Sequence, residues 1–158
     1  MRTLIKDCRL VSPGTDMQGA SVFAEGGTIR RIFLNGEKLP GADLAFDAGG
    51  AVAMPGFVDI HVHGAAGFDF MEADVQGMHA FMQAKLKEGV TTILPTTGCV
   101  SEENLSKSLQ CVSDYGSSHK PVMPKIAGIH LEGPYVSKKS IGALNPAFAR
   151  PPDIEEIR

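Results

Sequence analysis

Cysteine is scarce in this sequence of 158 residues, and the three that occur are far apart: Cys8, Cys99 and Cys111. An odd number of widely spaced cysteines without a CxxC pair excludes a disulfide framework and a zinc knuckle. We therefore expect three free, reduced thiols that only fill space.

The sequence also lacks an excess of charge of one sign, since 15 basic and 18 acidic side chains leave a formal net charge of −3 at pH 7. The basic residues are scattered, so no patch favours a nucleic-acid backbone or an anionic membrane surface. No stretch approaches the ~18 consecutive apolar residues of a membrane span. Lys6, Asp7 and Arg9 interrupt the segment in which a signal peptide needs its apolar region. These absences predict a cytoplasmic protein without nucleic-acid or membrane partners.

What the sequence does contain is typical of a globular protein with many short connections. A hydrophobic fraction of 43% and a charged fraction of 21% exclude a disordered or collagen-like chain. The 18 glycines and 10 prolines argue against a bundle of long helices. Short β-type segments separated by turn clusters occur at Thr3–Val11, Ser21–Ala24, Thr28–Leu34 and Ala51–Ala53. Residues 1–53 are therefore predicted to form a first, β-type domain.

A different pattern begins at Met54, where apolar strands alternate with helices. Strands are predicted at Phe57–His63, Thr91–Leu94 and Lys125–Leu131, and helices at Ala73–Glu88 and Glu102–Tyr115. This alternation indicates a parallel sheet, and the spacing of the strands is close to the ~31 residues per unit of a (β/α)8 barrel. Residues 54–158 would supply about three βα units, so we expect the first part of a TIM barrel and the N-terminal portion of a longer protein. A three-layer α/β domain is the alternative, but it would need more strands.

The strongest local feature is the run PGFVDIHVHG at residues 55–64, which places His61 and His63 two positions apart on a strand. Alternation puts both imidazoles on one face, and at the C-terminal end of a barrel strand that face looks into the mouth of the barrel. Two imidazoles on a rigid strand form half of a divalent-metal site suited to zinc or iron. Two polar core histidines are the plainer interpretation, but the Pro-Gly entry and the small-residue loop that follows favour metal ligands.

A second feature is the run IHLEGPY at residues 129–135, where a predicted strand ends on Glu132 and Gly-Pro turns the chain away. A carboxylate at the same rim of the sheet could reach a metal held near His61 and His63. Taken alone, a glutamate at the end of a strand is more often a solvated or capping residue.

The run PGFVDIHVHG resembles the first barrel strand of the amidohydrolase superfamily. Three other segments narrow the resemblance to the family of N-acetylglucosamine-6-phosphate deacetylases: EGGTIRRI at 25–32, GVTTILPTT at 89–97 and IAGIHLEGPYVSKKSIGALNPAF at 126–148. The likeness covers nearly the whole chain. HLEGPY followed by NPAF is much more specific than the HxH pattern.

The resemblance implies a metal-dependent hydrolase that removes acetate from N-acetylglucosamine 6-phosphate, in a TIM barrel flanked by a small β-sandwich built from both ends of the chain. Residues 1–53 would then be the N-terminal part of that sandwich. By the same analogy Glu132 is the principal metal ligand, His61 and His63 belong to a second metal position, and one or two divalent ions bind per subunit. The acid/base aspartate would lie beyond Arg158, so the isolated chain is expected to be inactive. The resemblance also implies a homodimer.

The resemblance places Ala143 and Leu144 on the wall of the substrate site. Many relatives have a histidine where this chain has Leu144, and leucine cannot donate a hydrogen bond to a sugar hydroxyl or a phosphate. A related acetamido sugar phosphate is therefore a second candidate substrate.

Other polar residues have weaker assignments. Asp59 either orients a ligand or has a buried structural role, and His130 is expected to be a hydrogen-bonded core histidine. His79 and His119 are assigned no role. The paired lysines Lys138 and Lys139 could attract a phosphate, although such pairs are usually solvated.

Two other functions remain open on the sequence alone. A cyclic amidohydrolase, such as a dihydroorotase or hydantoinase, shares PGFVDIHVHG but commonly uses a carboxylated lysine, and no lysine ends a barrel strand here. A non-catalytic metal-binding assembly module would be complete at this length and would close its core by oligomerisation.

Overall fold

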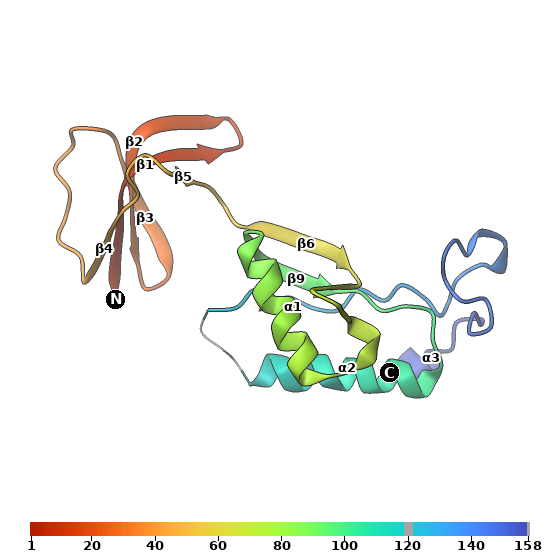
Figure 1. The fold of residues 1–158 in the computed structure, drawn as a ribbon. Coiled ribbons are helices and arrows are strands. Elements are labelled where there is room, and N and C mark those ends of the chain that lie inside the picture. Colours follow the sequence, from red (N-terminus) through yellow and green to blue (C-terminus); the bar gives the residue numbers. More distant parts are fainter. Residues whose placement is uncertain (119–121, 158) are drawn as a thin grey trace. The chain divides into compact units, whose positions relative to one another are not determined.

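The computed structural model describes residues 1–118 and 122–157, so His119 lies outside the described residues. The chain divides into two compact units, Met1–Pro55 and the part that begins at Gly56 (Figure 1). All three cysteines are free and buried, as the sequence predicts.

The first unit is a single five-stranded sheet. Its strands are β1 (Arg2–Ser12), β2 (Thr15–Glu25), β3 (Thr28–Phe33), β4 (Leu44–Asp47) and β5 (Val52–Ala53). The order is β3-β2-β1-β4, with β5 also paired to β1; β1 and β2 are antiparallel, whereas β4 and β5 run parallel to β1. A small core of Cys8, Ala20 and Val22 lies in this sheet. The sequence missed β4 because all four of its residues are exposed, so no alternation marks it.

The second unit is built around a three-stranded parallel sheet, which confirms the parallel arrangement predicted from the sequence. Its elements are β6 (Phe57–Val62), β7 (Gly64–Ala65), β8 (Phe68–Asp69), the 3₁₀ helix η1 (Phe70–Glu72), α1 (Val75–Lys87), β9 (Val90–Pro95), α2 (Glu102–Ser117), β10 (Lys125–Ile126), the 3₁₀ helix η2 (Lys138–Ser140) and α3 (Ile154–Ile157). The strand order β10-β9-β6 places β9 in the centre. The short β7–β8 hairpin occupies the segment that the sequence presents as a loop.

Both long helices pack with β9 in one hydrophobic core (Figure 1). Its fully buried members include Met78, Phe81 and Met82 of α1 and Ile93 of β9. These α1 positions recur at the three- and four-residue spacing of one helix face, whereas Val75, at the first helical position, is exposed. α2 begins where expected, since the Ser101 hydroxyl accepts a hydrogen bond from the Asn104 amide at 3.3 Å.

The predicted strand Lys125–Leu131 is wrong in length, because regular pairing ends at Ile126. Ala127 N donates to Ile93 O, and His130 N donates to Pro95 O, each at 3.0 Å. The chain thus advances three residues from 127 to 130 where β9 advances only two. This extra residue breaks the ladder and leaves an isolated bridge between Thr96 and His130.

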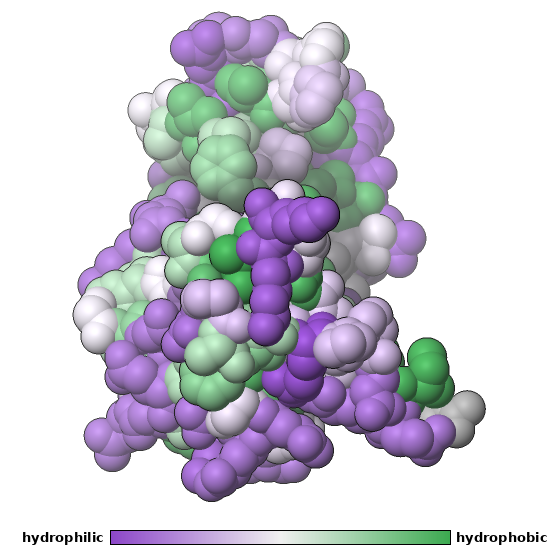
Figure 2. Space-filling model, turned by 90° about the vertical axis from the view of Figure 1, so that its right-hand side faces the viewer, coloured by the Kyte–Doolittle hydropathy of each residue, from purple (hydrophilic) through white to green (hydrophobic). Residues whose placement is uncertain are grey.

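The three strands of the parallel sheet leave apolar surface uncovered. β6 is an edge strand, and Phe57, Val58 and Ile60 are each more than half exposed. Figure 2 shows apolar side chains, in green, reaching the surface between hydrophilic ones. Among the described helices, none is both long and apolar enough to cross a membrane.

Replacing Gly77 of α1 by alanine is expected to destabilise the protein by about 1 kcal/mol. An added Cβ would lie 2.2 Å from Cδ2 of the buried Phe68 ring, and overpacking of about 1–3 kcal/mol outweighs the gain of up to about 1 kcal/mol in helix propensity. Gly116 of α2 is the matched control, because nothing lies within 4 Å of its added Cβ. Gly116→Ala should stabilise by about 0.5 kcal/mol in urea unfolding, and equal effects of the two changes would contradict the packing argument.

Candidate metal centre

The two candidate histidine ligands lie side by side, His61 at the C-terminal end of β6 and His63 directly after it. The rings of His61 and His63 have centroids 5.1 Å apart in an edge-to-face arrangement, as their two-residue spacing on a strand predicts. The His63 carbonyl accepts a hydrogen bond from the Phe70 amide at 2.7 Å, which fixes the chain after the second histidine.

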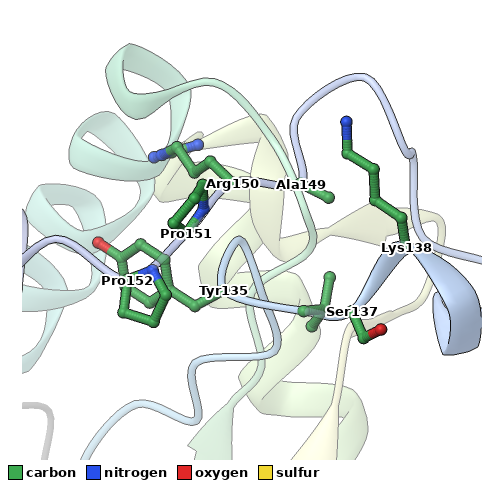
Figure 3. A pocket seen from close by; sticks show the side chains of 8 residues that line it. Tyr135, Ser137, Lys138, Ala149, Arg150, Pro151 and Pro152 are labelled. Carbon is green, nitrogen blue, oxygen red and sulfur yellow. The ribbon is translucent and has the colours of Figure 1, made fainter.

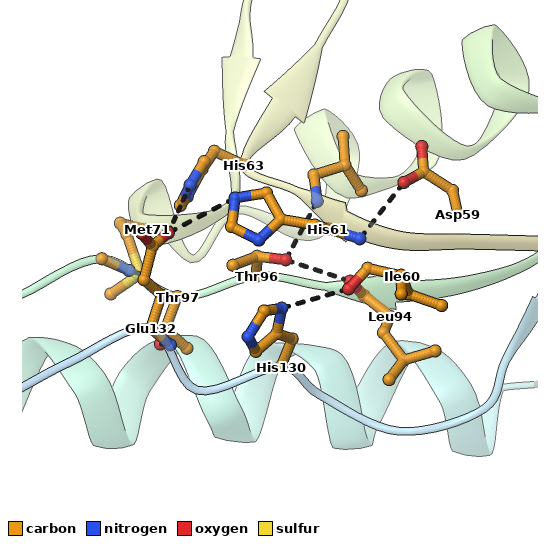
Figure 4. Close-up of polar contacts among 12 residues, drawn as sticks. Asp59, Ile60, His61, His63, Met71, Leu94, Thr96, Thr97, His130 and Glu132 are labelled. Atoms are coloured by element: carbon orange, nitrogen blue, oxygen red, sulfur yellow. Dashed lines mark hydrogen bonds and ion pairs between the residues drawn. The ribbon is translucent and has the colours of Figure 1, made fainter.

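The side chain of Glu132, which is far from His61 and His63 in the sequence, lies beside their two imidazole rings (Figure 4). Its Oε2 atom lies 2.9 Å from Nε2 of His63 and 3.4 Å from Nε2 of His61. One donor atom from each of the three residues lies within 4.8 Å of the others, which is a spacing that a single metal ion can bridge. The structure therefore brings together all three residues that the sequence selected as candidate ligands.

The chemistry of this group fits a divalent cation. Oε2 of Glu132 is shielded from solvent and has no hydrogen-bond partner among the described residues, although Nε2 of His63 lies 2.9 Å away. Leaving such an atom unpaired costs about 1–3 kcal/mol, and more when the group is charged. Two imidazole nitrogens and one carboxylate oxygen form a donor set suited to zinc or iron.

A glycine directly after Glu132 allows the turn that presents its side chain. Gly133 has φ +82°, a left-handed conformation that other residues rarely adopt. A Cβ at this position would lie only 3.1 Å from the Cβ of buried Cys99. Both the backbone conformation and the close approach therefore require glycine here.

The two secondary candidates near the histidines have structural contacts. The Asp59 carboxylate lies 3.0 Å from Lys85 Nζ through Oδ2, and its Oδ1 accepts the His61 amide at 3.3 Å. The His130 ring lies 5.0 Å from that of His61, and its Nδ1 lies 3.1 Å from the Ile60 carbonyl oxygen. His130 is thus hydrogen-bonded, as the sequence predicts, but it is only partly buried and does not belong to the hydrophobic core cluster of the described residues.

Lys85 is the main charged residue that sequence reasoning missed in this region. Lys85 is only 9% exposed. Its Nζ lies 2.6 Å from Oε2 of Glu88, in addition to its contact with Oδ2 of Asp59. The hydrogen bond that the Lys85 ammonium donates to Glu88 is the largest cause that raises the pKa of Lys85, against the opposing effect of burial. The sequence signal that could have identified Lys85 is the position of a lysine among the apolar residues of an amphipathic helix.

The candidate substrate residues lie on the segment after η2. Ala143 is exposed and Leu144 is half-buried, with the Leu144 amide donating to Ile141 O at 3.2 Å. Neither is hydrogen-bonded to the three candidate ligands within the described part of the chain. Lys138 and Lys139 are exposed on η2 and have no ion-pair partner among the described residues.

A separate groove of about 390 Å³ lies beyond the Glu132 turn (Figure 3). It is lined by Tyr135, Val136, Ser137, Lys138, Ala149, Arg150, Pro151 and Pro152. The Arg150 guanidinium lies 5.9 Å from the centre of the Tyr135 ring and pairs with Glu156. None of the three candidate metal ligands lines this groove.

The comparisons with known proteins include several enzymes named N-acetylglucosamine-6-phosphate deacetylase. No protein-family model matches the chain. It is 30% identical over 154 residues to N-acetylglucosamine-6-phosphate deacetylase of Bacillus subtilis, an alignment that covers 96% of this chain and 39% of that protein. The human enzyme of the same name is 30% identical over 150 residues, which cover 91% of this chain and 36% of that protein.

Solved structures give the same result. The deacetylase of Thermotoga maritima has a TM-score of 0.76 and 33% identity, covering 98% of this chain and 38% of that one. That of Pasteurella multocida has a TM-score of 0.83 at 24% identity, which supports the fold alone. The resemblance inferred from the sequence is confirmed, and the chain spans about two fifths of the length of these proteins.

Proposed function

We propose that this chain is the N-terminal portion of an N-acetylglucosamine-6-phosphate deacetylase, a metal-dependent hydrolase that releases acetate from N-acetylglucosamine 6-phosphate. The observation that carries the proposal is the convergence of His61, His63 and Glu132, with a shielded carboxylate oxygen that has no hydrogen bond within the part of the chain that the structure describes. The similarity to deacetylases over nearly the whole chain supports the same reaction.

In this proposal Glu132, His61 and His63 hold one or two divalent ions, of which zinc and iron suit the donors best. When bound, a divalent cation polarises the amide carbonyl and lowers the pKa of water at the site. Glu132 contributes the negative charge that offsets that of the cation. The three side chains are one third to one half exposed, so substrate can approach them from solvent.

Ala143 and Leu144 are proposed to line the sugar-binding wall. Leu144 supplies only apolar contact, so polar recognition of the sugar and phosphate must come from other groups. A related acetamido sugar phosphate is thus the competing substrate.

We further propose that the unit beginning near residue 54 is the first three βα units of a (β/α)8 barrel, and that residues 1–53 form part of a small β-sandwich. The open edge strand β6 and its exposed apolar side chains support a barrel that other segments complete.

The three free thiols fit the reducing cytoplasm. Light scattering after size-exclusion chromatography tests the homodimer that the resemblance implies.

Acetate release by the full-length protein tests the proposed activity. The protein is stripped with a chelator, reloaded with Zn²⁺ or Fe²⁺, and assayed with N-acetylglucosamine 6-phosphate and N-acetylmannosamine 6-phosphate. We expect acetate from the first substrate only after metal is restored, and none from residues 1–158 alone. Turnover of dihydroorotate or hydantoin would instead indicate a cyclic amidohydrolase. A metal-loaded protein inert toward all these substrates would leave the non-catalytic assembly module.

A further inference from the structure

The central strand of the parallel sheet contributes no candidate metal ligand, yet it contacts both segments that do. Thr96 and Thr97 directly follow β9, and both are fully buried at 0% exposure. Their neighbours on either side are the end of β6, with the two histidines, and the segment that carries Glu132.

Thr96 holds the residue between the two histidines. Its hydroxyl oxygen accepts a hydrogen bond from the Val62 amide at 2.9 Å and donates to Leu94 O at 3.3 Å. Its own amide donates to Val62 O at 2.9 Å. Both backbone groups of Val62 are therefore bound to this one threonine.

Thr97 holds the glutamate segment in the same way. Its hydroxyl oxygen accepts a hydrogen bond from the Glu132 amide at 3.1 Å, and its own amide donates to His130 O at 3.0 Å. The adjacent threonines thus bind the backbone of the candidate ligand Glu132 on one side and of the residue joining the two candidate histidines on the other.

The two threonine hydroxyls are needed because the regular backbone hydrogen bonding between the strands is interrupted near the C-terminal end of β9. From Asp59 to Val62, β6 advances three residues while β9 advances two, from Ile93 to Pro95. The segment from 127 to 130 has the same extra residue on the other side of β9. Backbone amides displaced from a ladder need other acceptors when buried.

We propose that Thr96 and Thr97 are positioning residues for the metal site, whose two hydroxyls fix the separation between the His61–His63 pair and Glu132. Among the described residues, their hydroxyls hydrogen-bond to backbone groups and to no ligand side chain, so they act through the backbone that carries the ligands. The proposal rests on the metal site proposed above. Mutation of a residue that orients a metal ligand without binding the metal typically changes the metal affinity by about 10- to 100-fold.

The test compares threonine variants that keep or remove the hydroxyl in the full-length protein. Thr96→Val and Thr97→Val keep the branched shape but lose the hydroxyl, whereas Thr96→Ser and Thr97→Ser keep it. Thr92→Val, on β9 itself, is the control, because its hydroxyl has no hydrogen-bond partner in the described part of the chain. Zn²⁺ affinity is measured by competition with a chromophoric chelator, and Co²⁺ is used as a spectroscopic probe of ligand geometry.

We expect each of the two valine variants to lose about 10-fold or more in Zn²⁺ affinity and to alter the Co²⁺ absorption spectrum. Both serine variants should restore affinity and spectrum, and Thr92→Val should match the wild type. Thermal unfolding identifies variants that are folded at the assay temperature; if a valine variant is not folded, the comparison of its serine variant with wild type decides. The positioning role of Thr96 and Thr97 would be overturned if folded valine variants had unchanged Zn²⁺ affinity and Co²⁺ spectrum. It would also be overturned if a serine variant lacked the wild-type affinity and spectrum. Neither result would affect the proposed metal site itself. A wild-type protein that binds no metal would overturn the proposed site as well.

Discussion

Glu132→Gln is expected to lower the Zn²⁺ affinity of the full-length protein by more than about 100-fold and to abolish acetate release. The loss should exceed the 10- to 100-fold typical of groups that only orient a ligand, because the change removes the only carboxylate of the three-residue group. Glutamine keeps the size of the side chain but removes its charge. Isothermal titration with Zn²⁺ and the acetate assay measure the two effects.

The same substitution gives a second readout without activity. Since Oε2 of Glu132 is shielded and accepts no hydrogen bond from residues 1–118 and 122–157, the metal-free variant should be at least as stable as the metal-free wild type. Zn²⁺ should raise the unfolding temperature of the wild type and not that of the variant.

Glu103→Gln is the matched control, because its carboxylate is 76% exposed and, among the described residues, pairs only with Lys107 on the surface of α2. It should behave as wild type in every assay. A Glu132→Gln protein that still gained stability with Zn²⁺ would remove Glu132 from the set of ligands.

Lys85→Met is expected to lower the free energy of unfolding by about 3 kcal/mol. The side chain is 11% exposed and lies between Asp59, which is 22% exposed, and Glu88. Removing one partner of a buried ion pair costs about 3–5 kcal/mol, because the remaining charge stays buried without compensation. The low end applies because the Asp59 carboxylate keeps some contact with water. Urea denaturation at pH 7 measures the change.

Lys87→Met is the control on the same helix. Lys87 is exposed and has no ion-pair partner among the described residues, so its replacement should change stability by less than about 0.5 kcal/mol. Adding Asp59→Asn to Lys85→Met should recover part of the loss, because the two residues interact directly. Purely additive losses would show that the pair does not interact.

The contribution of Lys85 should also depend on pH. Its pKa is raised in the folded protein, chiefly by the hydrogen bond to Glu88, whereas the unfolded value is about 10.4. The stabilisation is therefore complete below about pH 10.4 and decreases as the pH rises through the folded-state pKa. The stability difference between wild type and Lys85→Met should shrink above that pH, and a difference unchanged between pH 7 and pH 11 would contradict this assignment.

The sequence alone identified most elements that are marked by a regular pattern. The helix around Phe81 and the strands around Ile93 and His61 have periodic or continuous apolar residues, and the structure confirms them. The sequence-based prediction was wrong at two strands that lack a regular apolar pattern. Every residue of β4 is exposed, and β10 ends where one extra residue interrupts its pairing with β9.

For the site, the sequence determined which side chains are available, because two histidines spaced by one residue share a face of any strand and Glu-Gly-Pro ends another. Only the tertiary structure decided that Glu132 Oε2 comes within 2.9 Å of His63 and is shielded there. It also showed that Thr96 and Thr97 bind the backbone beside these ligands. The physical reason is register: one extra residue on each side of β9 sets which backbone groups leave the ladder, and no local periodicity encodes that offset.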